Sequence, residues 1–220
     1  MCKAFIFDLD GVITDTAEFH FQAWLRMANE EGYYFDRKIN EQLRGVSRRT
    51  SLSIILAGTK LSEIQTTVLM ARKNKYYLEQ LESLSEKDIL PGIRSLLLEL
   101  NARGIKVAVA SASRNARYVL YQLGLIPLFD AICDGWSVVR SKPEPDIFIH
   151  AAGQLRVNTC DCIVMEDAEA GIHAARAAGM QVVGIGPSAR VGQADWHFND
   201  TATFDLTTVL ENAEPNMMPG

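Results

Sequence analysis

Two aspartates separated by one residue follow a short apolar run at the start of the chain. Residues 3–7 have the length and composition of a buried strand, and Asp8-Leu9-Asp10-Gly11 follows them directly. Parallel α/β sheets bind ligands at the carboxyl ends of their strands, and two acids beside a buried strand need a cation or a reaction to compensate them. The pair predicts such a site, and an Asp-rich turn is the alternative that the pair alone leaves open.

Further polar residues follow later apolar runs. Ser111 stands at the end of the second predicted strand, Glu166-Asp167 stand at the end of the fourth, and Lys142 precedes a predicted helix. Because strands joined by helices form a parallel sheet with right-handed crossovers, these strand ends face the same edge of the sheet. We therefore expect six side chains to converge there: Asp8, Asp10, Ser111, Lys142, Glu166 and Asp167.

The expected cluster of four acids and one lysine has a definite chemistry. Acids this close repel one another unless a cation binds them, and an all-oxygen ligand set suits Mg²⁺. A magnesium ion would offset the negative charge that keeps a carboxylate from attacking a phosphoryl group, and Lys142 would hold the same phosphate from another side. Asp8 could then act as a nucleophile and form an aspartyl phosphate.

The elements that must position these residues alternate along the later part of the chain. Strands are predicted over residues 3–7, 105–110, 129–134, 162–165 and 182–185. Helices are predicted over residues 93–103, 116–123, 147–155 and 168–178. This alternation predicts an α/β fold with a Rossmann-like parallel sheet. The tail after residue 186 is less regular, with one helix expected over 205–210 and frayed residues at 216–220.

An all-helical block interrupts this alternation after the first strand. Helical spacing of apolar residues begins near Phe19 and continues over 39–43, 51–56 and 62–84, until Pro91-Gly92. We interpret residues 15–88 as an inserted helical cap domain, and residues 1–14 and 89–220 as the core domain.

Composition limits the class of partner. The 220 residues are 48% hydrophobic and 22% charged with a net charge of −5, which is typical of a globular protein. The sequence has no basic block, which argues against nucleic acid or an anionic membrane as the main partner and favours a small molecule. Without an apolar run of ~20 residues, we expect a cytoplasmic protein, and without an extended unmatched apolar segment we expect a monomer. The four cysteines lack metal-site spacing and are expected to be buried and reduced.

Four segments together resemble the motifs of the haloacid dehalogenase superfamily. They are Asp8-Leu9-Asp10-Gly11-Val12, Ser111 after an apolar strand, Ser141-Lys142-Pro143, and Glu166-Asp167 before a helix. The resemblance implies that Asp8 is the nucleophile and that Asp10 gives a backbone carbonyl to Mg²⁺ and serves as general acid and base. It also implies that Glu166 and Asp167 hold the metal, and that Ser111 and Lys142 bind the transferring phosphoryl group.

Residues of the helical block and its loops look like those of the β-phosphoglucomutase family. The matching segments are residues 11–18, His20, Ala23-Trp24, residues 40–43, Gly45-Val46-Ser47-Arg48, Arg72-Lys73-Asn74 and Ser111-Ala112-Ser113. That family interconverts β-glucose 1-phosphate and glucose 6-phosphate through a bisphosphate, with Mg²⁺ as cofactor. By this resemblance the substrate-binding residues are His20, Trp24, Leu43, Gly45, Val46, Ser47, Arg48, Ser51, Lys73, Ala112, Ser113, Arg114 and Asn115.

Within this set, the family's pattern implies that Arg48 grips the phosphate that is not being transferred and that His20 couples cap closure to Asp10. The sequence departs from the pattern at Arg114, where the family often has lysine, and at Trp136 and Arg140, in a loop that usually has smaller residues. These departures concern the identity of the sugar more than the type of reaction.

Each cap residue also has a structural interpretation. Arg48 could be a solvated arginine at a helix start, Lys73 part of a charged helix face, Trp24 part of the cap core, and His20 a surface histidine. For the whole chain, the alternatives to a mutase are a sugar-phosphate phosphatase on the same scaffold and a non-catalytic protein that binds phosphosugars.

Overall fold

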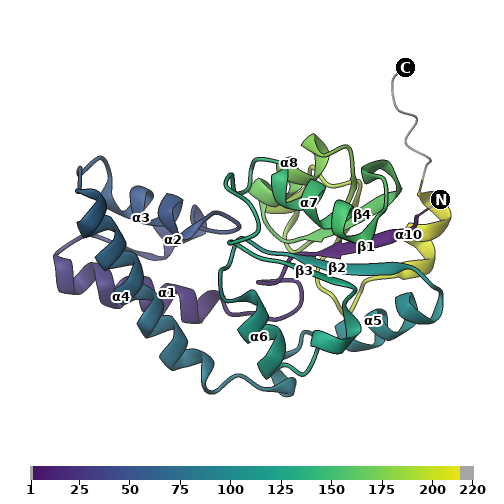
Figure 1. Ribbon diagram of the computed structural model, residues 1–220, viewed down its shortest axis with the longest axis horizontal. Coiled ribbons are helices and arrows are strands. Elements are labelled where there is room, and N and C mark those ends of the chain that lie inside the picture. Colours follow the sequence, from purple (N-terminus) through teal and green to yellow (C-terminus); the bar gives the residue numbers. More distant parts are fainter. Residues whose placement is uncertain (1, 214–220) are drawn as a thin grey trace.

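Six parallel strands form one sheet in the order β3-β2-β1-β4-β5-β6. The computed structural model describes residues 2–213, and the sheet spans most of that range (Figure 1). The strands are β1 (Ala4–Phe7), β2 (Lys106–Ala110), β3 (Ala131–Cys133), β4 (Cys162–Glu166), β5 (Gln181–Ile185) and β6 (Trp196–Phe198). The predicted α/β fold with a parallel, Rossmann-like sheet is confirmed.

Helices connect the strands and cover both faces of the sheet. They are α5 (Ile93–Ala102), α6 (Ala116–Gln122), α7 (Asp146–Leu155), α8 (Glu169–Ala177), α9 (Ser188–Val191) and α10 (Leu206–Asn212). Short 3₁₀ turns are η1 (Glu86–Asp88), η2 (Ile126–Leu128) and η3 (Thr159–Asp161). The tail contains a strand and a helix, β6 and α9, that the sequence did not predict, because three or four residues are too few to reveal a period. The expected fraying of residues 216–220 lies outside the described residues.

Alternate side chains of the central strand serve two different cores. Phe5 and Phe7 belong to a cluster that includes residues of α5, α6 and α10. Ala4 and Ile6 belong to a second cluster, formed with residues of α7 and α8. A strand points successive side chains to opposite faces, so the continuous apolar run of β1 is what a strand buried on both faces requires.

Four of the five α-helices between β1 and β2 lie beside one end of the sheet (Figure 1). They are α1 (Ala17–Glu31), α2 (Arg37–Glu41), α3 (Arg48–Leu56) and α4 (Glu63–Leu81), referred to below as the helical part. Side-chain caps mark the starts of α3 and α4: the Ser47 hydroxyl accepts a bond from the Thr50 N–H, and Ser62 forms a capping box with Gln65. Helices α1 and α4 pack against each other.

The register of the sheet places the strand ends that carry the motifs side by side. Phe7 is paired with Val109 of β2 on one side and with Met165 of β4 on the other. The N–H of Asp8 donates to the carbonyl of Met165 at 2.9 Å. Asp8 and Glu166, and with them Ser111, therefore lie at the same edge of the sheet, the edge nearest the helical part.

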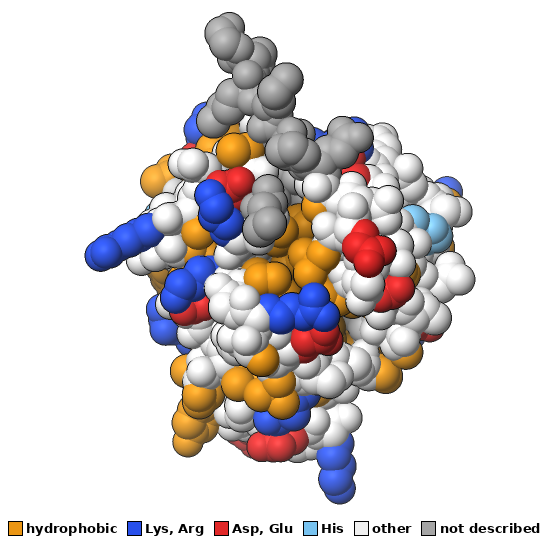
Figure 2. Space-filling model, turned by 90° about the vertical axis from the view of Figure 1, so that its right-hand side faces the viewer, with side chains coloured by type: hydrophobic (Ala, Val, Ile, Leu, Met, Phe, Trp, Pro, Cys, Tyr) orange, Lys and Arg blue, Asp and Glu red, His pale blue; other side chains and the backbone are white. Residues whose placement is uncertain are grey.

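The surface carries charges of both signs. Figure 2 shows the end of the core that faces away from the helical part, where basic and acidic side chains are interspersed. No helix within residues 2–213 has the length and apolar character needed to cross a bilayer. The four cysteines are free, as expected, and Cys133 and Cys162 are buried. Burial was wrongly predicted for Cys2 and Cys160, which are only half-buried because they lie near the chain start and on η3.

Candidate active site

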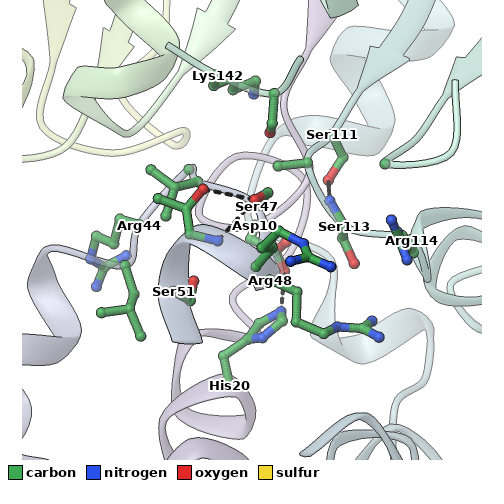
Figure 3. A pocket seen from close by; sticks show the side chains of 18 of the residues that line it. Asp10, His20, Arg44, Ser47, Arg48, Ser51, Ser111, Ser113, Arg114 and Lys142 are labelled. Carbon is green, nitrogen blue, oxygen red and sulfur yellow. Dashed lines mark hydrogen bonds and ion pairs between the residues drawn. The ribbon is translucent and has the colours of Figure 1, made fainter. Parts of the chain in front are cut away.

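A cavity of about 650 Å³ lies between the helical part and the carboxyl edge of the sheet. It is lined by Asp8, Asp10, His20, Trp24, Leu43, Gly45, Val46, Ser47, Arg48, Ser51, Lys73, Ser111, Ala112, Ser113, Arg114, Lys142 and Asp167, among others (Figure 3). Two residues assigned from the sequence do not line it. Glu166 is buried directly behind it, and Asn115 touches Asn74 at its side.

Asp8 and Lys142 form a buried ion pair at the sheet end of the cavity. The Lys142 Nζ donates to Asp8 Oδ1 at 2.6 Å and to Glu166 Oε1 at 2.5 Å. Burial alone would lower the pKa of Lys142, but the two carboxylates outweigh burial and raise it. The lysine therefore stays charged, next to a carboxylate that is 4% exposed and borders the cavity. This arrangement suits a carboxylate that meets an anionic group.

Three carboxylates crowd together beside this lysine. Ligand oxygens of Asp8, Glu166 and Asp167 lie within 4.8 Å of one another, and all three residues are buried. Burial, aided by Asp8, raises the pKa of Glu166 to about 7 although Lys142 opposes it. Burial and the neighbouring Glu166 also raise the pKa of Asp167 well above its usual range. Burial raises both pKa values most and neighbouring carboxylates add to the shifts, and this all-oxygen set fits a hard divalent cation.

Two arginines that the sequence analysis did not assign to the site contact Asp167. Arg44 Nη1 lies 3.3 Å from Asp167 Oδ2, and Arg190 Nη2 lies 3.6 Å from the same oxygen. Arg190 Nε also donates to the Asp167 carbonyl at 2.7 Å. Arg44 stands beside the matched Gly45 and could have been suspected. Arg190 lies in α9, where the sequence has no recognisable motif.

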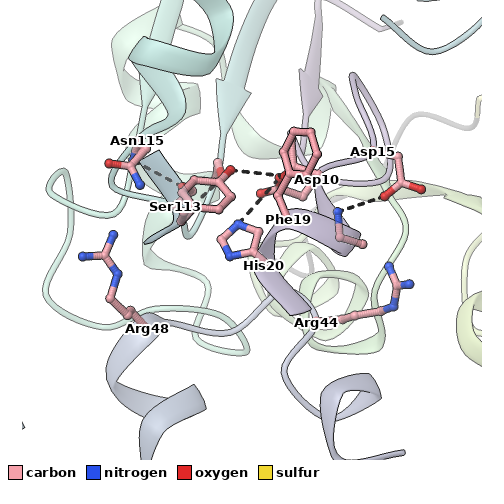
Figure 4. A network of polar contacts seen from close by, with 12 residues as sticks. Asp10, Asp15, Phe19, His20, Arg44, Arg48, Ser113 and Asn115 are labelled. Carbon is pink, nitrogen blue, oxygen red and sulfur yellow. Dashed lines mark hydrogen bonds and ion pairs between the residues drawn. The ribbon is translucent and has the colours of Figure 1, made fainter. Parts of the chain in front are cut away.

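Asp10 lies in the loop after β1 and faces the helical part. The Thr16 hydroxyl donates to Asp10 Oδ1, and His20 Nε2 lies 3.9 Å from the same oxygen (Figure 4). Burial, with the charge of Asp8, raises the pKa of Asp10 to about 6, against the lowering effect of Thr16. A carboxyl group that titrates near neutral pH suits a general acid and base.

Lys73 is buried in the helical part and touches His20. Its side chain is 2% exposed, and its Nζ lies 2.7 Å from His20 Nδ1, so the alternative of a charged, solvated helix face is wrong. Burial and the charge of Arg48 lower the pKa of Lys73 well below its usual range. Burial and the charge of Lys73 likewise lower the pKa of His20. The imidazole is therefore neutral at physiological pH.

Aromatic side chains surround this pair. Tyr77 stacks on His20 with ring centroids 4.1 Å apart and donates to the Thr16 hydroxyl at 3.2 Å. Lys73 Nζ lies 5.0 Å from the centroid of the Trp24 ring, which is 3% exposed. Trp24 thus belongs to the core of the helical part and lines the cavity as well. Tyr77 was not predicted, since its spacing looks like that of any core residue on a helix.

Arg48 extends from the first turn of α3 toward the core (Figure 4). It donates to Asn74 Oδ1 at 2.7 Å, and Asn115 donates to the same oxygen at 2.9 Å. Burial and the nearby charge of Arg114 lower the pKa of Arg48 to about 10. The alternative of a freely solvated arginine is therefore wrong. Among residues 2–213, no carboxylate lies within ion-pair distance of Arg48 or Arg114, and both residues line the cavity.

Small residues and serines complete the walls. The loop at Gly45 has φ +71°, and a Cβ there would lie 3.0 Å from Ala168 Cβ, so glycine lets the helical part approach the core. Ser111 is buried, and its hydroxyl accepts the N–H of Ser113 at 3.1 Å. The structure brings these residues together as expected, and their individual roles stay predictions.

The parallel sheet, the acidic edge and the helices inserted after β1 define a Rossmann-like hydrolase-type core with an inserted helical part. A model of haloacid dehalogenase-like hydrolases matches residues 2–179. A β-phosphoglucomutase from Bacillus subtilis is 46% identical over 216 residues, which cover 96% of each chain. The chain therefore belongs to the haloacid dehalogenase-like hydrolase family, and within it to the β-phosphoglucomutases.

Two further comparisons bear on this assignment. The crystal structure of a β-phosphoglucomutase from Clostridium difficile superimposes with a TM-score of 0.94 at 40% identity, covering 97% of both chains. A phosphatase of phosphorylated carbohydrates from Thermotoga maritima is 30% identical over 87% of this chain and 89% of its own. The phosphatase is thus more distant than the two mutases.

Proposed function

We propose that this chain is a β-phosphoglucomutase, an isomerase that interconverts β-glucose 1-phosphate and glucose 6-phosphate through glucose 1,6-bisphosphate. The observation that carries the proposal is one cavity with two sets of anion-binding groups. Lys142 donates to Asp8, and Figure 3 shows Lys142 and Ser111 at one end of the cavity, with Arg48 and Arg114 on other walls. A bisphosphate has two anionic ends and needs both sets at once.

The reaction begins with a phosphorylated Asp8. The C6 hydroxyl oxygen of β-glucose 1-phosphate attacks phosphorus, its proton passes to the Asp10 carboxylate, and the bond from phosphorus to Asp8 breaks. The bisphosphate then turns around in the cavity. Asp8 attacks the C1 phosphate, the bond from phosphorus to the C1 oxygen breaks, and that oxygen takes the proton back from Asp10. Glucose 6-phosphate leaves, and Asp8 is again phosphorylated.

The chain's own residues hold the reacting groups. Lys142 and Ser111 would bind the phosphoryl group in transfer, and Arg48 and Arg114 the other phosphate. Asp8, Glu166, Asp167 and the backbone carbonyl of Asp10 would hold Mg²⁺, in keeping with the acidic cluster. When bound, the ion offsets negative charge between the carboxylate and the phosphoryl group.

The remaining expectations are part of the same proposal. Residues 15–88 would move as a cap over a core of residues 1–14 and 89–220, with the contacts of Arg48 and Gly45 at the moving boundary. The substrate is a small sugar phosphate, and the enzyme acts as a cytoplasmic monomer. Gel filtration with light scattering tests the oligomeric state.

A coupled assay tests the proposed function. The enzyme is given β-glucose 1-phosphate with Mg²⁺ and a trace of glucose 1,6-bisphosphate, and glucose 6-phosphate and inorganic phosphate are measured together. Isomerisation far faster than phosphate release is expected. Phosphate released from glucose 6-phosphate as fast as β-glucose 1-phosphate is isomerised would identify a phosphatase instead.

A further inference from the structure

Arg114 packs against the aromatic ring of Trp136. Its guanidinium carbon lies 3.9 Å from the centroid of the Trp136 ring. Trp136 is 69% exposed and stands in the loop after β3, whose neighbours Gly135, Val138 and Val139 line the cavity. The ring therefore lies at the mouth of the cavity, beside the exposed cation of Arg114, which also lines the cavity.

The loop that carries Trp136 is fixed in place. Asp134 is buried, and its Oδ1 accepts the N–H of Trp136 at 2.9 Å. The N–H of Gly135 donates to the carbonyl of Ser113 at 3.1 Å. A Cβ at Gly135 would lie 2.5 Å from the Ala112 carbonyl oxygen and 2.9 Å from Arg114 Cγ, so only glycine allows this close approach. The indole therefore stands on a backbone anchored to the Arg114 segment.

An aromatic face suits this position for an electrostatic reason. Arg114 is exposed and shares the cavity with Arg48, so in the absence of an anion the two positive charges repel and Arg114 is driven toward solvent. A carboxylate could hold the guanidinium but would cancel its charge and compete with phosphate. The face of an indole attracts the cation, leaves its charge intact and leaves its N–H edge free for an anion.

We infer that Trp136 is a positioning residue, which holds the Arg114 guanidinium over the cavity so that Arg114 and Arg48 grip the phosphate that is not being transferred. This inference rests on the proposed function, since it deepens the role of that same site. A side chain held in its binding geometry loses less conformational freedom when the ligand arrives, so the stacking contributes to affinity. Because the non-transferred phosphate keeps this contact throughout the transfer, the effect falls on KM more than on kcat.

The test measures binding without turnover. In the Asp8→Asn background, the Kd for glucose 1,6-bisphosphate is measured by calorimetry for Trp136→Ala, Trp136→Phe and Arg114→Ala. Trp136→Ala is expected to raise the Kd roughly two- to fivefold, and Trp136→Phe to restore most of the affinity. In the Arg114→Ala background, Trp136→Ala should have no further effect. Tyr121→Ala removes an equally exposed aromatic ring, on α6, and serves as the matched control.

With Asp8 intact, a second readout separates positioning from a general structural role. Trp136→Ala should raise KM for β-glucose 1-phosphate while phosphorylation of Asp8 by acetyl phosphate, which has no second phosphate, keeps its wild-type rate. An unchanged Kd, an equal loss with both substrates, or an undiminished effect in the Arg114→Ala background would overturn the inference. The Kd measurement does not depend on whether the wild-type enzyme is a mutase or a phosphatase. The proposed role of Trp136 and the proposed mutase activity can therefore be refuted independently of each other.

Discussion

The buried Nζ of Lys73 lies 2.7 Å from Nδ1 of His20. When Lys73 is protonated, its ammonium can only donate hydrogen bonds, so Nδ1 accepts and the proton of the neutral imidazole sits on Nε2. That Nε2 points toward Asp10 Oδ1, 3.9 Å away (Figure 4). The gap is too long for a hydrogen bond, and a small movement of the helical part would close it. A protonated Lys73, on α4, therefore places the His20 proton on the ring nitrogen that lies nearer to Asp10.

The nucleophile can be tested by one isosteric change. Asp8→Asn keeps the shape of the side chain, but an amide oxygen cannot form the acyl phosphate. We expect mutase and phosphatase turnover to disappear together, while circular dichroism and thermal melting show a folded protein. Substantial activity in either assay by the folded variant would remove Asp8 from this role.

Much of this site could be predicted because its core residues follow strands. A parallel sheet gathers strand ends at one edge, so the apolar runs before Asp8, Ser111 and Glu166 were enough to bring these residues together. The contact between His20 and Lys73 joins residues 53 positions apart, on two helices whose packing angle no local pattern encodes. For the same reason Arg190 stayed hidden: α9 is only four residues long.

The acidic cluster predicts a pH dependence of stability. In the metal-free protein the pKa of Glu166 is raised from 4.5 to about 7, so the folded state binds a proton more tightly than the unfolded state. Its contribution to the free energy of unfolding is therefore present at low pH and is lost as pH rises from about 4.5 to about 7. Urea midpoints measured in EDTA across this range should fall more steeply for the wild type than for Glu166→Gln.

Added Mg²⁺ should oppose this loss, because the ion binds the ionised carboxylates that the metal-free fold disfavours. The stabilisation should grow with pH and be smaller in Glu166→Gln. Urea midpoints of the wild type and Glu166→Gln that change in parallel with pH in EDTA would count against the raised pKa of Glu166. An equal stabilisation of the two proteins by Mg²⁺ would count against the metal site.

Protonation of Asp10 should cause the decline of kcat/KM at low pH, the acid limb of the pH–rate profile. Transfer from phosphorylated Asp8 to a sugar needs an ionised Asp10, whose pKa is about 6, so kcat/KM should decline below that pH. Thr16→Val removes the hydrogen bond that lowers this pKa and should move the limb to higher pH. Thr14→Val is the control, since the buried Thr14 hydroxyl donates to the Asp88 carbonyl instead. If the acid limb stays at the same pH in Thr16→Val, it reports the titration of a group other than Asp10.

Arg48 should matter only for a substrate that places a phosphate in the part of the cavity away from Asp8. Arg48→Ala loses a charge-assisted contact, so we expect kcat/KM for β-glucose 1-phosphate to fall roughly ten- to a hundredfold. Phosphorylation of Asp8 by acetyl phosphate should be nearly unchanged. Arg37→Ala, which removes an exposed arginine paired with Glu18, is the control for charge loss. Equal losses with both donors would place Arg48 in folding or at the Asp8 end of the cavity.

The preference for sugar over water should depend on His20. A mutase must keep phosphorylated Asp8 from hydrolysis, so Asp10 should reach the reacting oxygen only when the helical part has closed over a bound sugar. The long distance from His20 Nε2 to Asp10 Oδ1 is the gap that closure would shorten. General acid and base help contributes ~10²–10⁴-fold, which is enough to make hydrolysis slow beside transfer when that help is withheld.

We therefore expect His20→Ala to lower the ratio of transfer to hydrolysis, measured as glucose 6-phosphate formed against inorganic phosphate released. His20→Gln should keep more of the ratio, because an amide nitrogen near the position of Nε2 can still donate to Asp10 while its oxygen accepts from Lys73. Transfer and hydrolysis slowed by the same factor in His20→Ala would show that His20 supports the site as a whole. A ratio of transfer to hydrolysis that is highest with histidine, intermediate with glutamine and lowest with alanine would identify the Nε2 proton as the group that links closure to Asp10.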